Sequence, residues 1–160
     1  MNKVSLAFTG HRPNKLGGYS PAAQAKLVRI AKEFLLPRKE IIKDCYSGMA
    51  LGWDQAAALA CMDLGIPFIA AVPFEGQETA WPASSQAEFR RILNAAAKVV
   101  EVCEPGYAAW KMQKRNEYMV DQSRLLVALW DGTSGGTANC VGYARKQNRL
   151  VVNLWLKFAL

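Results

Sequence analysis

The sequence has few residues of the kinds that hold metals or form disulfides. Its 160 residues include one histidine, and its cysteines are widely scattered, with no Cys-x-x-Cys pair. Zinc sites and disulfide frameworks depend on closely spaced ligands or cysteine pairs, so neither is expected, and we predict no metal and no other cofactor. We interpret the cysteines as reduced residues in or near the core. They are Cys45, Cys61, Cys103 and Cys140.

Long hydrophobic segments are also missing. No apolar run reaches the roughly 18 to 20 residues of a membrane-spanning helix, and the opening segment 1–8 leads into a turn instead of a signal-peptide cleavage pattern. We therefore expect a cytoplasmic protein without a membrane partner. The length and the 51% hydrophobic composition suit one well-buried core. We predict a single domain over residues 1–160.

Basic residues are absent from the middle of the chain. Residues 44–89 carry six acidic and no basic side chains, so the net charge of +7 comes from residues 1–43 and 90–160. A basic balance favours anionic ligands or nucleic acid, but the acidic middle argues against a uniformly basic groove. Single-strand binding also needs aromatic and basic residues that alternate along a surface, and the sequence does not show them. Nucleic acid is therefore the least favoured partner.

Strand-like and helix-like segments alternate along the chain. The apolar, β-branched runs that predict strands are 4–9, 41–46, 66–72, 99–103, 125–130 and 150–155. One predicted helix begins at Ser20-Pro21, where Ser20 supplies the cap and Pro21 occupies the first helical position. A second predicted helix begins near Gly52 and ends at Gly65. Three more helices are predicted at 85–96, 110–122 and 137–147. In the first of these, Ser85 and Glu88 resemble a capping box.

This alternation predicts an α/β fold. Successive parallel strands joined by right-handed crossovers form a Rossmann-like, doubly wound, mainly parallel sheet flanked by helices. Ligands bind such sheets beyond the carboxyl ends of the strands. One irregular segment, residues 73–82, is either a lid or a crossover loop, and its Trp81 is the best candidate for stacking on a base.

Glycine-bearing turns are expected to meet at that edge of the sheet. Missing side chains allow close approach to the backbone, and the free N–H groups of a helix N-terminus favour an anion such as phosphate. The turn before the last long helix fits this best, so we predict a phosphate-bearing small molecule. The candidate ligand-binding residues are Thr9, Gly10, His11, Arg12, Ser47, Gly48, Ala50, Gly52, Asp54, Arg115, Asn116, Asp131, Gly132, Thr133, Ser134, Gly135, Gly136 and Thr137.

Three of these side chains have competing interpretations. Arg12 suits a forked contact with phosphate or carboxylate, but an ion pair with Asp54 or Asp131 would also account for it. Asp54 either contacts a ribose hydroxyl or caps the helix that begins beside it. For His11, orienting its loop by hydrogen bonding is favoured over proton transfer.

Four ordered motifs resemble the SLOG superfamily. They are Thr9-Gly10-His11-Arg12-Pro13, the segment from Ser47-Gly48 to Asp54, Arg115-Asn116 with Met119, and Trp130-Asp131-Gly132 with Gly135-Gly136-Thr137. Within the superfamily, the chain is most similar to small bacterial and phage proteins that open with Thr-Gly-His-Arg-Pro. The superfamily includes the Lonely Guy phosphoribohydrolases and the Rossmann domain of DprA. The resemblance implies a Rossmann-like fold, a nucleotide or nucleotide-derived ligand, and a homo-oligomer, for which the apolar tail 154–160 is a candidate surface unless it completes the core strand.

The resemblance also bears on catalysis. Lonely Guy enzymes cleave the N-glycosidic bond of nucleoside monophosphates with an arginine and a glutamate. Arg115 corresponds to the arginine, but Cys140 occupies the glutamate position, and a thiol does not readily replace a carboxylate in this chemistry. The leading hypothesis is therefore a sensor or sequestering protein. The alternatives are an N-glycosidase for nucleoside 5′-monophosphates, with Arg115 and Asp54 as catalytic residues, and single-stranded DNA binding like that of DprA.

Overall fold

The computed structural model describes residues 2–160 and contains a parallel sheet of six strands. The strand order is β4-β3-β2-β1-β5-β6, and every neighbouring pair is parallel. The strands are β1 (Val4–Gly10), β2 (Ile42–Ser47), β3 (Phe68–Val72), β4 (Lys98–Glu101), β5 (Leu125–Leu129) and β6 (Leu150–Asn153). Each overlaps a predicted apolar run, and the predicted α/β, Rossmann-like fold is confirmed.

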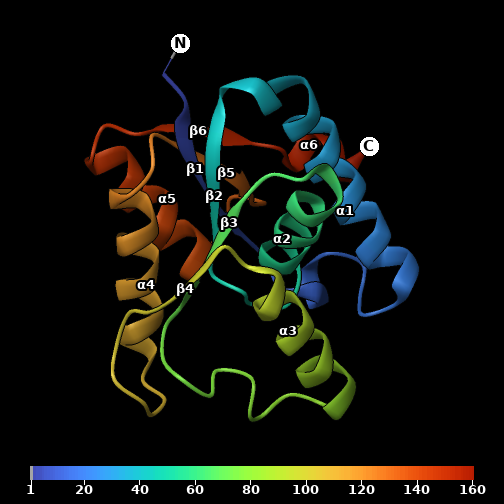
Figure 1. Cartoon of the computed structure of the whole chain (residues 1–160), viewed down its shortest axis with the longest axis vertical. Helices are drawn as coiled ribbons and strands as arrows, with labels where there is room; N and C mark the ends of the chain where they lie inside the picture. Colours follow the sequence, from blue (N-terminus) through green and yellow to red (C-terminus); the bar gives the residue numbers. More distant parts are fainter. Residues whose placement is uncertain (1) are drawn as a thin grey trace.

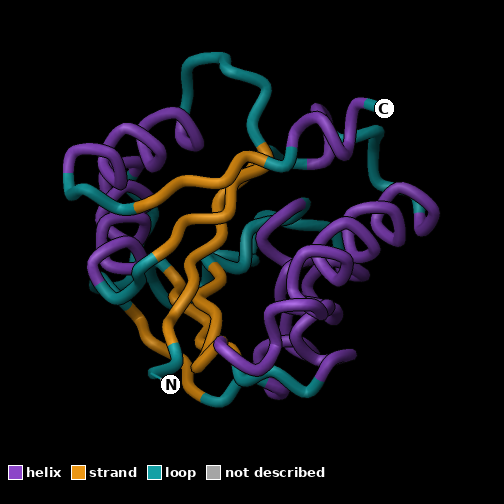
Figure 2. Tube along the Cα trace, turned by 90° about the horizontal axis from the view of Figure 1, so that it is seen from above, coloured by secondary structure: helices purple, strands orange, loops and turns teal. Residues whose placement is uncertain are grey.

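Helices cover both faces of this sheet, as Figures 1 and 2 show. They are α1 (Pro21–Leu35), α2 (Trp53–Leu64), α3 (Ala83–Ala95), α4 (Ala109–Asp121), α5 (Gly136–Lys146) and α6 (Trp155–Ala159), with short 3-10 turns at η1 (Pro13–Lys15) and η2 (Leu36–Ile41). One layer holds α1, α2, α3 and α6, and the other holds α4 and α5. Because β1 lies between β2 and β5, the chain departs in opposite directions from this point, where doubly wound sheets bind ligands.

Two predicted helix signals act as expected. Ser20 Oγ accepts a hydrogen bond of 3.1 Å from the N–H of Ala23, and Pro21 is the first residue of α1. Gly65 ends α2 in the left-handed conformation, with its N–H bonded to carbonyls of the last turn. These local signals fix where two of the crossovers begin and end.

Two sequence predictions are wrong. The proposed capping box of Ser85 and Glu88 does not form, because α3 begins earlier, after Pro82, and Glu88 instead pairs with Arg91 at 2.8 Å. The predicted last strand is also too long. Asn153 Oδ1 accepts hydrogen bonds from the backbone N–H groups of Trp130 and Trp155, which ends β6 and starts α6. The tail therefore follows the core strand as a short helix.

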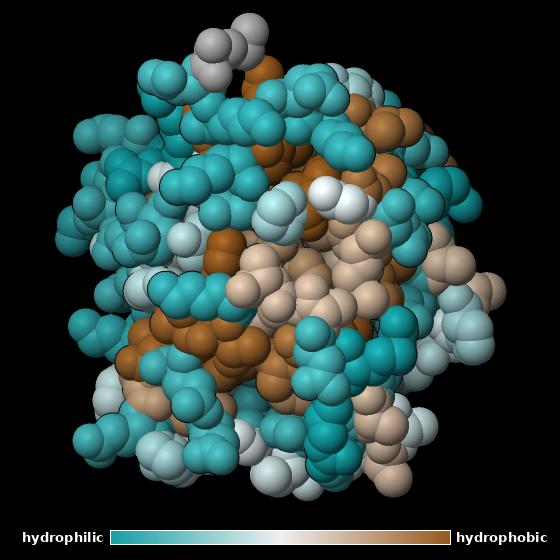
Figure 3. All heavy atoms as spheres, in the orientation of Figure 1, coloured by the Kyte–Doolittle hydropathy of each residue, from teal (hydrophilic) through white to brown (hydrophobic). Residues whose placement is uncertain are grey.

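The core lies in two parts, one on each side of the sheet. On the α1 and α2 side, large side chains such as Phe8 and Trp53 are fully buried. On the α4 and α5 side, the strands present small residues, including Ala7 and Ala128, against Met119. Hydrophilic side chains surround an apolar area in the middle of the face drawn in Figure 3. None of the helices in residues 2–160 is long and apolar enough to cross a membrane.

Candidate functional site

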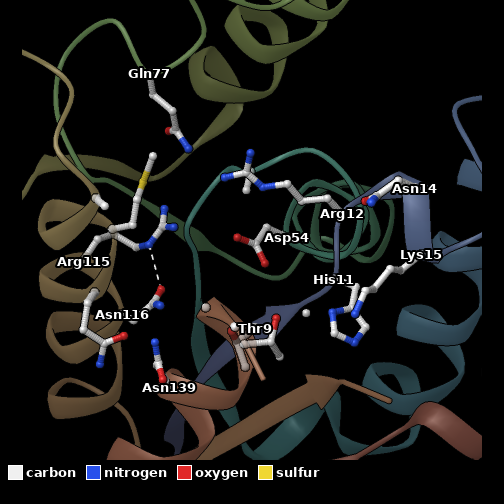
Figure 4. Close-up of a pocket in the computed structure, with 18 of the residues that line it drawn as sticks. Thr9, His11, Arg12, Asn14, Lys15, Asp54, Gln77, Arg115, Asn116 and Asn139 are labelled. Atoms are coloured by element: carbon white, nitrogen blue, oxygen red, sulfur yellow. Dashed lines mark hydrogen bonds between the residues drawn. The ribbon is translucent and has the colours of Figure 1, made fainter. Parts of the chain in front are cut away.

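A pocket of about 750 Å³ opens beyond the carboxyl ends of the strands. Its walls come from the turn after β1, the start of α2, the loop after β3, the start of α4 and the turn between β5 and α5 (Figure 4). This is the predicted edge of the sheet. The candidate residues that line the pocket are Thr9, Gly10, His11, Arg12, Ala50, Asp54, Arg115, Asn116, Thr133, Ser134, Gly135, Gly136 and Thr137.

The other candidates lie outside the pocket lining. Ser47, Gly48, Gly52, Asp131 and Gly132 are not part of the lining. A Cβ on Gly48 would lie 2.5 Å from Nη1 of Arg115, and one on Gly52, whose φ is +98°, would lie 2.6 Å from the carbonyl oxygen of His11. The missing side chains of both glycines therefore make room for the Arg115 guanidinium and the His11 carbonyl, whereas the sequence analysis predicted that they make room for a ligand.

The turn between β5 and α5 is held by a compact set of hydrogen bonds. Asp131 Oδ1 accepts from the N–H and the hydroxyl of Thr133, at 2.9 and 2.5 Å. Nε2 of His11 lies 2.8 Å from the same oxygen and 3.0 Å from the N of Asp131. His11 thus connects the end of β1 to the turn between β5 and α5, whereas the sequence prediction concerned the loop of His11 itself. The Thr133 bonds, followed by His11, hold the pKa of Asp131 well below its usual range.

This turn delivers an uncapped helix to the pocket. Gly135 precedes α5 and has no side chain to cap it, and Gly135 and Gly136 are exposed. The first N–H groups of a helix have no partners within that helix. Lys15 reaches the same place from η1, where its Nζ donates to Thr133 Oγ1 at 2.7 Å. Its Nζ also lies 3.6 Å from Oδ2 of Asp131. The turn thus gathers hydrogen-bond donors at a helix N-terminus, where anions are favoured.

Asp54 lies in the middle of the pocket, between two arginines (Figure 4). It is in the first turn of α2 but does not cap it, because Gly52 is the N-cap and no side chain bonds there. Burial raises the pKa of Asp54 to about 6, and the charges of Arg115 and Arg12 oppose that rise. No acidic oxygen in residues 2–160 lies within 4.0 Å of the Arg12 guanidinium, so the expected alternative of an ion pair is not observed.

Arg115 is fixed by the protein. Its guanidinium donates to the carbonyl of Gly48 and, at 3.0 Å, to Oδ1 of Asn116, and only 4% of the residue is exposed. Burial lowers the pKa of Arg115, while Asp54 raises it. Cys140, at the glutamate position implied by the resemblance, is fully buried, and burial raises the pKa of its thiol to about 12. The thiol is therefore neutral near pH 7.

The predicted ligand-binding residues left out the wall opposite α5, from which the sequence suggested only Trp81 as a stacking residue. Phe74 and Tyr107 make an edge-to-face contact with 6.2 Å between ring centroids, and Trp81, the proposed stacking residue, lies edge-on to Phe89. Lys111 donates to the carbonyls of Glu104 and Gly106, which holds the loop that carries Tyr107. The lining residues outside the predicted set of ligand-binding residues are Asn14, Lys15, Phe74, Gln77, Ala80, Trp81, Tyr107, Ala109, Met112, Gln113 and Asn139.

The described residues offer no evident metal site. In residues 2–160, no three His, Cys, Asp or Glu side chains gather in a way that would hold a metal ion. The lining combines polar side chains, backbone N–H groups and three aromatic rings. An organic anion with an apolar, flat part matches this lining better than a bare ion.

Solved structures share this fold over almost the whole chain. DprA from Streptococcus pneumoniae matches with a TM-score of 0.66 and 19% identity, over 93% of this chain and 49% of that one. DprA from Helicobacter pylori, described with a single-stranded DNA binding mode, gives 0.64 and 17%, over 94% and 64%. The molybdenum cofactor carrier protein from Chlamydomonas reinhardtii gives 0.59 and 19%, over 95% and 76%. This chain thus spans about half to two thirds of the DprA chains.

The fold, with its glycine-bearing turns at the strand ends, defines a protein of the SLOG class. A model of the YspA SLOG family matches residues 6–150, and the chain belongs to that family. It is also 38% identical to the uncharacterized SPbeta prophage-derived protein YoqJ of Bacillus subtilis (strain 168), over 76% of this chain and 79% of that protein. The resemblance to SLOG proteins seen in the sequence is confirmed.

Proposed function

We propose that the pocket binds a nucleotide or nucleotide-derived small molecule, with its phosphate at the N-terminus of α5. The observation that carries this proposal is the uncapped, exposed start of α5 at Gly135 and Gly136, inside a pocket that also contains Lys15 and Arg12. Backbone N–H groups at such a terminus bind phosphate oxygens directly, and the two cations add favourable charge. The hydroxyls of Thr133, Ser134 and Thr137 supply further donors.

The rest of the pocket suits the remainder of a nucleotide. Phe74, Trp81 and Tyr107 line the side away from α5. Aromatic faces and edges stabilise a flat base by stacking and apolar contact. About 750 Å³ lies within the usual range for pockets that enclose small organic ligands.

A holding role, as a sensor or a sequestering protein, agrees with the state of Cys140. A neutral, fully buried thiol cannot act as the carboxylate that N-glycosidic cleavage requires. We therefore place retention of the ligand ahead of its turnover.

Mass spectrometry of small molecules released by denaturing the freshly purified protein tests this proposal. Wild-type protein is expected to release a nucleotide-like compound, and the Arg12→Ala variant is expected to release much less. Arg29→Ala is the matched control, because Arg29 is an exposed arginine on α1 outside this pocket. Empty wild-type protein that also fails to bind adenine-, guanine- and ADP-ribose-containing compounds in calorimetry would overturn the proposal.

An N-glycosidase is the second candidate, and Asp54 is the observation that favours it. Among the described residues of the lining, Asp54 alone is acidic, and a carboxyl group with a pKa of about 6 can exchange protons near neutral pH. Arg115 lies near enough to influence that pKa. Release of free base from nucleoside 5′-monophosphates that disappears in Asp54→Asn would support an enzyme, and no turnover of any substrate would exclude it.

Single-stranded DNA is the third candidate, because the Helicobacter pylori DprA structure is described with such a binding mode. A gel-shift assay with wild-type protein and Arg12→Ala addresses it. A shift that disappears at modest salt and is equal in both proteins would indicate only non-specific attraction to phosphates. A shift that persists and depends on Arg12 would move DNA ahead of small molecules.

A further inference from the structure

Five buried side-chain oxygen atoms lack hydrogen-bond partners in residues 2–160, and three of them belong to residues that line the pocket. These three are Oδ1 of Asp54, Oε1 of Gln77 and Oε1 of Gln113. Leaving a buried polar atom unpaired costs about 1–3 kcal/mol, and such atoms are rare in native proteins. Three of them on one cavity indicate that its occupant brings hydrogen-bond donors to these positions.

All three atoms act as acceptors. The amide of Gln77 is oriented by its Nε2, which donates to the carbonyl of Gly48 at 3.3 Å, and its oxygen is left without a partner. Nε2 of Gln113 likewise donates to Glu117 at 3.4 Å. An ionised Asp54 accepts hydrogen bonds and donates none. A phosphate, which is itself an acceptor near neutral pH, does not fit here, whereas hydroxyl and amino groups do.

Asp54 and Gln77 are buried firmly enough to discriminate between ligands. Only 6% of Asp54 and 8% of Gln77 is exposed, so bulk water cannot freely replace a missing ligand donor. Ser47 Oγ donates to the backbone carbonyl of Asp54 at 2.7 Å, which fixes the start of α2 beneath the carboxylate. Both acceptors are therefore preorganised by bonds within the protein.

The order of the groups along the pocket matches that of a nucleotide. In Figure 4, Asp54 lies between Thr9 on one side and Gln77 on the other. Thr9 belongs to the side of the pocket near α5, and Gln77 belongs to the loop after β3 that also carries Phe74 and Trp81. With a phosphate on α5, the sugar falls at Asp54 and the base at Gln77.

We propose that the site selects ribonucleotides with an amino-bearing base, because a ribose hydroxyl donates to Asp54 and the exocyclic amino group of the base donates to Gln77. This inference rests on the proposed nucleotide-binding function. It adds that recognition of sugar and base depends on two buried acceptors at fixed positions. Inosine and uridine nucleotides place a carbonyl oxygen where that amino group would be, so two acceptors face each other at Gln77, and their ring N–H lies at the neighbouring position.

Calorimetry with matched nucleotide pairs tests the proposal on the wild-type protein. The pairs are AMP against its 2′-deoxy and 3′-deoxy forms, AMP against IMP, and CMP against UMP, all at pH 8, where Asp54 is ionised. Removal of one ribose hydroxyl is expected to weaken binding by at least about tenfold, as is replacement of the amino group. Equal affinity for AMP and both deoxy forms, or for amino and oxo bases, would overturn the proposal.

Two variants assign the selectivity to these side chains. Asp54→Ala, which removes the acceptor, is expected to bring AMP and its deoxy forms to within about threefold of one another, and Gln77→Leu is expected to do the same for AMP and IMP. Asp63→Ala makes the same substitution on an exposed part of α2, where Asp63 pairs with Lys32, and both preferences should persist. Preferences that survive in Asp54→Ala and Gln77→Leu would contradict the assignment.

The panel separates this inference from the proposed function. If nucleotides bind but sugar and base make no difference, the proposed function stands and the inference fails. If no nucleotide, ribo or deoxy, binds to the wild-type protein, both fail.

Discussion

His11 and Asp131 join the end of β1 to the turn after β5, with 2.8 Å between Nε2 and Oδ1. When Nε2 carries a proton it donates to the carboxylate, and when it does not it accepts from the N–H of Asp131 at 3.0 Å. The contact therefore exists in either protonation state. Because Asp131 also holds Thr133, this pair determines where the start of α5 lies relative to Arg12 and Lys15.

Replacing Asp131 should weaken ligand binding more than it weakens the fold. Asp131→Ala removes the acceptor for the Thr133 N–H, the Thr133 hydroxyl and His11, although the side chain is outside the pocket lining. We expect affinity for the nucleotide ligand to fall about tenfold, because the donors of the turn are no longer fixed. The melting temperature should change little, since the turn is exposed. Calorimetry with a bound nucleotide such as AMP and thermal unfolding measure the two effects.

The same carboxylate gives the turn a direction of pH dependence. The folded-state pKa of Asp131 lies below its ordinary value, so the stabilisation by the ionised form is present above about pH 4. It is lost as pH falls through the folded-state pKa. The protection factor of the Thr133 amide, which corrects for the slower intrinsic exchange at low pH, should therefore fall on acidification in the wild-type protein and show no such step in Asp131→Ala. An identical pH profile in the two proteins would contradict the role of Asp131.

Asp54 should have the opposite effect on stability. Burial raises its pKa from 3.8 to about 6, so the folded protein binds this proton more tightly than the unfolded chain does. Stability is consequently lost as pH rises from about 4 to about 6, and the loss persists above that range. Asp54→Asn avoids it and should stabilise the ligand-free protein at pH 8 by up to about 3 kcal/mol, reduced by whatever compensation Arg115 loses.

Urea unfolding at pH 4 and pH 8 measures this difference. The stability gained by Asp54→Asn over wild type should be large at pH 8 and small at pH 4, while Asp63→Asn should show little gain at either pH. A gain of the same size at both pH values would mean that the carboxyl group of Asp54 is not the one that titrates. A buried carboxylate that serves ligand binding but lowers the stability of the ligand-free protein is common at functional sites.

Local signals in the sequence were enough to predict the fold. Strands such as Leu125–Leu129 are short apolar runs, and helix limits such as Ser20-Pro21 and Gly65 depend on the neighbouring residues alone. Of the two errors, the capping box at Ser85 and Glu88 was a local one, because Glu88 pairs with Arg91 one turn further on, and the other occurred where a distant group decided the outcome. Asn153 ends β6 because it bonds to Trp130, 23 residues away, and no periodic pattern reports that contact.

The side of the site formed by the turns after β1 and β5 was also predictable from local sequence. The turns after β1 and β5 carry glycine and basic residues, and parallel strands bring their carboxyl ends together. The wall formed by Phe74, Gln77 and Tyr107 was missed, because loop residues have no periodicity and their approach depends on how two crossovers end. The purpose of Gly48 was misjudged because Arg115, which lies against it, is 67 residues further along the chain.

The expected homo-oligomer remains a prediction, and the structure offers a surface for it. Leu150 and Leu156 are more than 70% exposed, Leu160 is 97% exposed, and β6 is an edge strand of the sheet. Exposed apolar residues beside an open edge favour association between copies. Light scattering after gel filtration should give a mass above that of one chain, and Leu156→Glu should reduce it. A wild-type protein that stays monomeric at high concentration would exclude this surface as an interface.

Two glycines beside the pocket should respond to alanine in opposite ways. Gly52 has a φ of +98°, and a Cβ there would lie 2.6 Å from the carbonyl of His11, whose position the start of α2 requires. Gly52→Ala should therefore destabilise the fold by at least about 2 kcal/mol, which lowers the melting temperature by several degrees.

Gly136, the first residue of α5, has open space around such a Cβ. Gly136→Ala should leave stability within about 1 kcal/mol of wild type. The added methyl group nevertheless stands where a phosphate would approach the helix, so affinity for AMP or another bound nucleotide should fall. Unfolding curves and calorimetry on both variants separate the effects, and full ligand affinity in Gly136→Ala would remove the N-terminus of α5 from the binding site.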